Sequence, residues 1–190
     1  MRDDKSAVLS DVCVALTDDQ LAVAADILRD RYPFVPLANV GRRYTFRQMI
    51  AVFTRDGFVD RYSGTRLVFP ATLRLISKLL PESFPFHRNG RLDICHFAFW
   101  EMFPTIDHFV PVARGGADDA SNWITTSMVR NAAKSAFTLD ELGWSLRPPG
   151  KIAEWDGLTG WFVDRAKADP AILTDIYFRQ WFAAATQHEQ

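Results

Sequence analysis

The side chains best suited to chemistry gather between Pro104 and Lys134. Asp107 and His108 are neighbours, and Asn131 lies three residues before Lys134. A carboxylate or an amide oxygen is a ligand for a hard cation such as Mg²⁺. A neutral imidazole can take a proton from water near pH 7, and an ammonium group can meet a phosphate oxygen. Together these residues predict a site that holds one divalent cation and activates one water molecule beside a phosphate.

Regular elements must bring these side chains together. The sequence predicts, in chain order, a strand over 106–112, a loop over 114–121, a strand over 123–126 and a helix over 127–135. Neighbouring residues on a strand point to opposite faces, so Asp107 and His108 face one cavity only at a strand end or a bulge. Asn131 and Lys134 share one face of the predicted helix because they are three residues apart.

The predicted loop carries Gly115 and Gly116, which permit a chain reversal that other residues resist. Asn122 follows this loop and precedes the second strand, where an asparagine can bind backbone groups and pin the loop. Taken separately, an exposed turn explains the Asp-His pair and a solvated helix face explains Asn131 and Lys134. Their joint occurrence at this spacing favours a site.

This arrangement resembles the HNH endonucleases, a branch of the ββα-metal nucleases. The resemblance rests on Asp-His-x-x-Pro, Gly-Gly, an Asn before a short strand, and Asn-x-x-Lys on a helix. His108 matches the first histidine of the family motif, the general base, and Asn122 matches its middle asparagine. Asn131 stands at the third position, Asp107 matches the acidic metal ligand, and Lys134 matches a basic residue often found after the third position.

The resemblance implies an α+β fold with a ββα-metal core, flanked by N-terminal helices and a C-terminal helix. It implies hydrolysis of phosphodiester bonds, most often in DNA, with products that carry a 5′ phosphate. Asp107 and Asn131 would hold the cation, and their oxygens favour Mg²⁺ or Mn²⁺. Many relatives also carry paired Cys-x-x-Cys zinc ligands. This chain has only Cys13 and Cys95, so no structural zinc is expected.

The charge balance supports a rival interpretation. The chain has 22 basic and 23 acidic residues, a net charge of −1, whereas nucleic-acid binders are often strongly basic. A non-catalytic nucleic-acid-binding or protein-interaction module that keeps the ββα shape would fit this balance. Competent residues at all five positions of the motif favour the nuclease.

The remaining segments predict mostly helices. Capping boxes at Thr17 and Thr138, a capping threonine at Thr45, and prolines at Pro70 and Pro170 indicate five helix starts. The first of these helices is expected over 17–31, and residues 58–69 predict two extended pieces around a Ser-Gly turn. We expect a helical region over 1–57, the nuclease core over 58–145 and a helical extension over 146–190, packed as one unit.

Other polar residues have simpler explanations. Either His87 or His96 could supply a second metal or phosphate ligand, although a surface or hydrogen-bonded histidine is the commoner case. Asp118 and Asp119 are expected to solvate the loop. No run of about 18 apolar residues predicts a membrane span. The polar, acidic start does not resemble a secretory signal, so we expect a cytoplasmic protein. The sequence does not indicate the oligomeric state.

Overall fold

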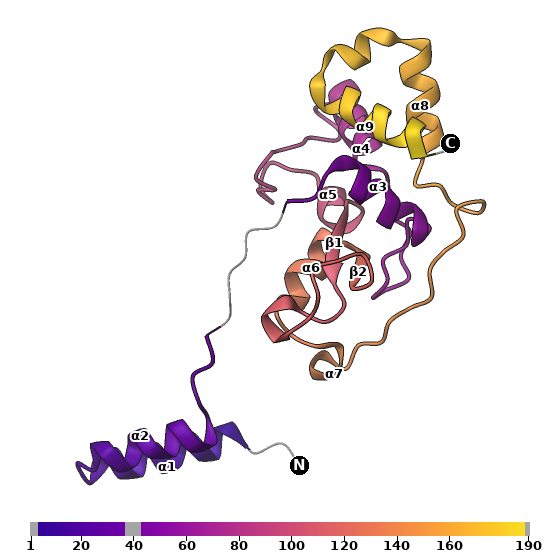
Figure 1. Ribbon diagram of the computed structural model, residues 1–190. Coiled ribbons are helices and arrows are strands. Elements are labelled where there is room, and N and C mark those ends of the chain that lie inside the picture. Colours follow the sequence, from indigo (N-terminus) through magenta and orange to yellow (C-terminus); the bar gives the residue numbers. More distant parts are fainter. Residues whose placement is uncertain (1–3, 37–42, 189–190) are drawn as a thin grey trace. The chain divides into compact units, whose positions relative to one another are not determined.

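The computed structural model describes residues 4–36 and 43–188 (Figure 1). The chain divides into two compact units, residues 1–39 and residues 40–190. The helix that follows Thr45 therefore lies in the second unit. Among the described residues, no helix is both long enough and apolar enough to cross a membrane.

The first unit is a hairpin of α1 (Lys5–Thr17) and α2 (Leu21–Arg31), which lie side by side (Figure 1). Asp4 caps α1 by accepting a hydrogen bond from the backbone of Ser6. The predicted helix start at Thr17 is wrong. Thr17 is the last residue of α1, and its hydroxyl donates to the carbonyl of Cys13 instead of capping α2.

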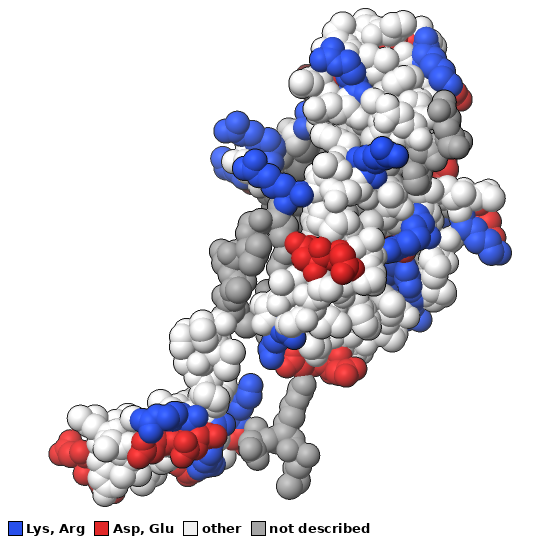
Figure 2. Space-filling model, in the orientation of Figure 1, with Lys and Arg blue, Asp and Glu red and all other residues white. Residues whose placement is uncertain are grey.

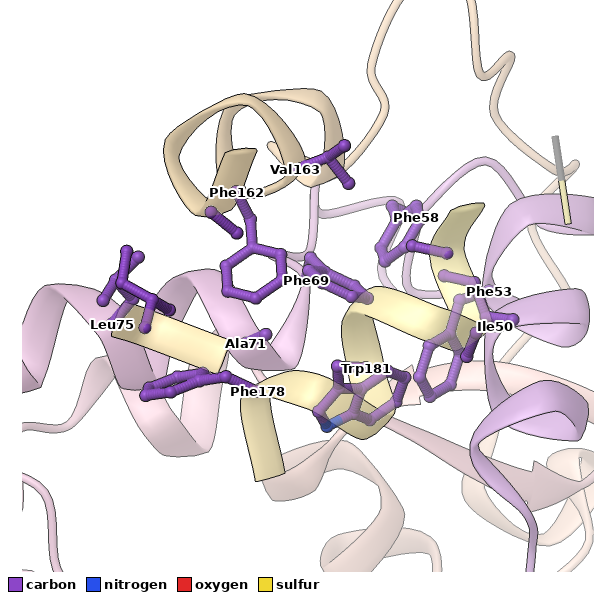
Figure 3. Packing of buried hydrophobic residues seen from close by; sticks show 14 of the residues in the cluster. Ile50, Phe53, Phe58, Phe69, Ala71, Leu75, Phe162, Val163, Phe178 and Trp181 are labelled. Atoms are coloured by element: carbon purple, nitrogen blue, oxygen red, sulfur yellow. The ribbon is translucent and has the colours of Figure 1, made fainter. Parts of the chain in front are cut away.

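The second unit is built around a cluster of buried aromatic and aliphatic side chains (Figure 3). This core unites α3 (Phe46–Arg55), α4 (Pro70–Leu79), α8 (Thr159–Ala168) and α9 (Ile176–His188). Trp181 of α9 is buried and stacks with Phe53 of α3 and edge-on against Phe69. Because α3 and α9 share this core, α3 and the expected C-terminal extension belong to the same unit as the sheet.

Local sequence signals correctly predicted where several of these helices begin. Thr45 and Thr138 form complete capping boxes at the starts of α3 and α7 (Leu139–Leu142). Pro70 occupies the first turn of α4. The segment from Pro170 differs, since it forms a short 3-10 turn, η2 (Pro170–Thr174), before α9 begins at Ile176.

A two-stranded antiparallel sheet lies beside this helical core, so the chain mixes helices and sheet in agreement with the α+β class. β1 (Pro104–His108) pairs with β2 (Trp123–Ser127), with Asp107 opposite Ile124 and His108 opposite Trp123. The short helix α5 (Ala98–Glu101) precedes β1, and η1 (Val112–Arg114) occupies the intervening loop. Val112 thus lies outside the strand predicted for it.

Helix α6 (Met128–Lys134) follows β2 directly and packs against both strands. It starts where Ser127 turns from strand geometry and accepts a hydrogen bond from the backbone of Arg130. The end of β1 lies next to the last turn of α6, where Lys134 binds the carbonyl of His108. These are the elements that carry the predicted site residues.

Candidate functional site

Asp107 lies near the end of β1 and is almost completely buried. Its Oδ2 atom accepts a hydrogen bond of 2.6 Å from the hydroxyl of Tyr62 and lies 3.1 Å from the Nζ atom of Lys134. Burial raises the pKa of Tyr62 far above its ordinary value, and the Asp107 carboxylate raises it further. Tyr62 therefore remains a hydrogen-bond donor to this carboxylate at any physiological pH.

Lys134 is the last residue of α6, and its side chain is fully buried. Besides the ion pair with Asp107, its ammonium donates a 2.8 Å hydrogen bond to the backbone carbonyl of His108. The sequence predicted that Lys134 would meet a phosphate on an exposed helix face. In this structure the ammonium instead joins α6 to the end of β1.

His108 is 2% exposed and points to the opposite side of β1 from Asp107. Its Nε2 atom lies 2.7 Å from Oδ1 of Asp118, and the same carboxylate atom accepts a hydrogen bond from Nε1 of Trp123. An ionised carboxylate is only an acceptor, so Nε2 carries the proton and Nδ1 becomes the acceptor of a neutral ring. Asp118, which was expected merely to solvate the loop, orients the imidazole.

Asn122 precedes β2 and is buried. Its amide makes three hydrogen bonds of 2.8 Å, accepting from the backbone nitrogen of Val110 and donating to the carbonyls of Val110 and Ala117. These bonds tie together the two ends of the loop. Gly116 is required beside them, because a Cβ atom there would lie 1.9 Å from the Val110 carbonyl oxygen.

Asn131 lies one turn before Lys134 on α6 and is half-buried. Its Nδ2 atom donates to the hydroxyl of Thr105 at 3.0 Å and to the carbonyl of Ile106 at 3.2 Å. The amide nitrogen is therefore held toward β1. The amide oxygen is the atom that remains for a cation.

Two further carboxylates support the site from residues 56–60. Asp56 accepts a 2.7 Å hydrogen bond from the backbone nitrogen of Thr125, and Asp60 accepts one of 2.9 Å from that of Ser127. Both carboxylates are buried, and Asp56 also pairs with Arg61 at 2.9 Å. They occupy the edge of β2 that does not face β1, so they fix the strand that leads into α6.

Tyr62, Asp56 and Asp60 were not predicted as site residues. The sequence indicated only extended pieces around a turn in this segment, and that form is present. Val59 and Arg66 make an isolated antiparallel bridge, and Asp60 and Thr65 share a backbone hydrogen bond. The available signal was a pair of aspartates, Asp56 just before the first extended piece and Asp60 within it.

The two histidines upstream of the motif have local partners. His96 is exposed and stacks on Phe84, with ring centroids 4.5 Å apart, and its Nδ1 accepts from the backbone of Ala98. His87 is half-buried and accepts a hydrogen bond from the backbone of Asn89. Neither contact requires a role in the site around β1.

The donor chemistry of the site suits a hard cation only in part. Asp107 and Asn131 each present one oxygen that takes no hydrogen bond from the described residues, and Mg²⁺ commonly keeps several waters beside one or two carboxylates. The Lys134 ammonium already compensates the Asp107 charge, so a cation there would compete with a buried ion pair. Within residues 4–36 and 43–188, no three histidine, cysteine or acidic side chains cluster as a metal site.

No protein-family model matches the chain, and no curated protein or solved structure is significantly similar to it. The functional assignment therefore depends on the geometry of the residues themselves.

Proposed function

We propose that the chain is a metal-dependent endonuclease that hydrolyses phosphodiester bonds, with DNA as its substrate. The observation that carries the proposal is the Asp118–His108 pair at the end of β1, beside a loop held by Asn122. A carboxylate on one imidazole nitrogen fixes the tautomer and makes the opposite nitrogen more basic. Such a ring is suited to removing a proton from water.

In the proposed reaction, Nδ1 of His108 takes a proton from a water molecule as the water oxygen bonds to phosphorus. The bond from phosphorus to the 3′ oxygen breaks, which leaves a 5′ phosphate on the product. Asp118 stabilises the imidazolium that forms, and Asn122 keeps the loop that carries Asp118 next to β1. The oxygens of Asp107 and Asn131 would hold a divalent cation that stabilises charge on the scissile phosphate. Because Asp107 lies on the side of β1 opposite His108, the end of the strand must also twist before the cation and the imidazole can meet the same phosphate.

Substrate access requires a local change. His108 is 2% exposed, so water and phosphate reach Nδ1 only if the loop over residues 109–121 moves. Lys134 acts in this scheme through the His108 carbonyl and Asp107, since its buried ammonium is not placed to touch a phosphate. It is a positioning residue for β1.

DNA binding would rely on local contacts. The net charge is −1, and on the face in Figure 2 basic and acidic side chains are interspersed. Each phosphate neutralised by the protein contributes about −0.9 to the slope of log affinity against log salt. A modest number of contacts therefore predicts a shallow dependence of affinity on salt.

A second candidate is the non-catalytic module, and two observations favour it. The imidazole is almost completely shielded from solvent, and the ion pair with Lys134 occupies the carboxylate that would hold a cation. A module of this kind would keep both features permanently, whereas an enzyme would open the loop when substrate binds.

Nicking of supercoiled plasmid separates the two. The enzyme predicts nicking with Mg²⁺ or Mn²⁺ that chelator abolishes, and a loss of about 10²–10⁴-fold in His108→Ala. His96→Ala is the matched control, since His96 is an exposed histidine with only local contacts, and it should remain active. Absence of nicking with either metal, or equal activity in His108→Ala, would leave the binding module as the better account.

A further inference from the structure

A pocket of about 180 Å³ lies between α4, the loop after it, α5, the start of α6 and α9. Its volume resembles that of a 150 Å³ protein cavity that holds benzene, so it suits a ligand with about one ring. Most of the pocket wall is apolar, and none of the described residues that line it is acidic. The lining includes Arg74, Phe86, His87, Arg88, Phe99 and Tyr177.

Arg74 is the polar group that defines the pocket. Its guanidinium carbon lies 3.7 Å from the ring centroid of Phe86 and 5.1 Å from that of Tyr177. Stacking against aromatic faces leaves the N–H groups of a guanidinium free in its plane. Arg74 is half-buried, and it makes no ion pair or hydrogen bond with the described residues, although burying a charge without a partner is costly. An anionic ligand would supply the missing acceptor.

We propose that this pocket binds a small anion with a single aromatic ring, its carboxylate or phosphate paired with Arg74. The ring would occupy the apolar interior beside Phe99, and Arg88 at the exposed rim would add positive charge. This site goes beyond the proposed nuclease and does not depend on it. Two kinds of ligand combine an anionic group with a ring in this way: a free aromatic acid and a nucleotide, which would pair with Arg74 through its phosphate.

Calorimetric titration of the full chain tests the proposal with four probes: benzoate, phenyl phosphate, thymidine 5′-monophosphate and uncharged benzyl alcohol. At least one anion should bind saturably, and benzyl alcohol about tenfold or more weakly, because a charge-assisted hydrogen bond is lost. Binding of benzoate alone indicates an aromatic acid, and binding of both phosphates indicates a nucleotide. No saturable binding of any anion, or equal binding of benzyl alcohol, would overturn the site.

Arg74→Gln should weaken binding of the anion about tenfold or more. Arg66→Gln is the matched control, because the exposed Arg66 also stacks on an aromatic ring, that of Trp155, but lies outside the pocket. If Arg74→Gln does not fold, Arg88→Gln at the rim takes its place, with a smaller expected loss of affinity for the anion. Unchanged affinity in a folded Arg74→Gln variant would refute the assignment.

Discussion

The buried ion pair between Lys134 and Asp107 gives the sharpest prediction. Lys134→Met keeps most of the apolar stem but removes the ammonium, which leaves the carbonyl of His108 without its donor. It also leaves the Asp107 carboxylate with one described partner, the hydroxyl of Tyr62. The sequence alone predicted loss of a phosphate contact from this change, whereas the structure predicts loss of stability.

The magnitude follows from burial. Removing one partner of a buried ion pair costs about 3–5 kcal/mol, because the remaining charge is left without compensation. In a protein of this size about 1 kcal/mol lowers the melting temperature by roughly 2–4 °C, so a drop of about 6–20 °C is expected. Lys151→Met is the matched control. Its ammonium lies 3.0 Å from Glu154, nearly the same separation, but both side chains are well exposed, and such pairs contribute about 0–1 kcal/mol.

Chemical denaturation of four proteins completes the test: the parent, Lys134→Met, Asp107→Asn and the double variant. The double variant leaves neither charge alone, so it should lose less stability than the sum of the single changes, by about 0.5–3 kcal/mol. A loss in Lys134→Met no larger than in Lys151→Met would refute the argument from burial. Normal stability combined with slow DNA cleavage in Lys134→Met would instead support the prediction that Lys134 contacts a phosphate of the substrate.

Three other changes have expected outcomes. Asn122→Ala should lower the free energy of unfolding by about 1–3 kcal/mol, because loop groups lose buried partners, and an unchanged melting curve would contradict this role. Asp118→Asn should slow metal-dependent nicking and change its pH profile while the melting temperature stays near that of the parent; an identical profile would exclude Asp118 as the orienting group. Burial raises the pKa of Tyr177 to about 12. Its contribution to stability is therefore complete below its ordinary pKa of about 10 and is lost as pH rises toward 12, so Tyr177→Phe should lose less stability than the parent between pH 9 and 12 in urea melts.

Features that depend on a few neighbouring residues could be predicted from the sequence. The capping boxes at Thr45 and Thr138 set helix starts because the cap and its partner are only three residues apart. The position of Asn122, directly after a glycine loop, predicted that it would bind loop backbone, and its three hydrogen bonds are of that kind. Thr17 shows the limit of such signals, because an earlier helix already included it.

Features that depend on contacts distant in sequence could not be predicted. Helical spacing placed Lys134 on a face with Asn131, but it could not show that this face packs on a sheet and buries the ammonium. Tyr62 is 45 positions from Asp107, and no local pattern links them. Asp118 is exposed, as expected for an acidic loop residue, but only the folded loop brings its carboxylate to His108.

The placement of charges around the sheet gives these contacts a common physical reason. An isolated hairpin of two strands is marginally stable, so its geometry must be imposed from outside. Asp56 and Asp60 bind the outer edge of β2 through backbone nitrogens, and Lys134 binds the end of β1 through the His108 carbonyl. Apolar contacts would be less directional than these charge-assisted hydrogen bonds. The imidazole of His108 is thus fixed at its backbone by Lys134 and at Nε2 by Asp118, which leaves Nδ1 as the ring atom on which any chemistry must depend.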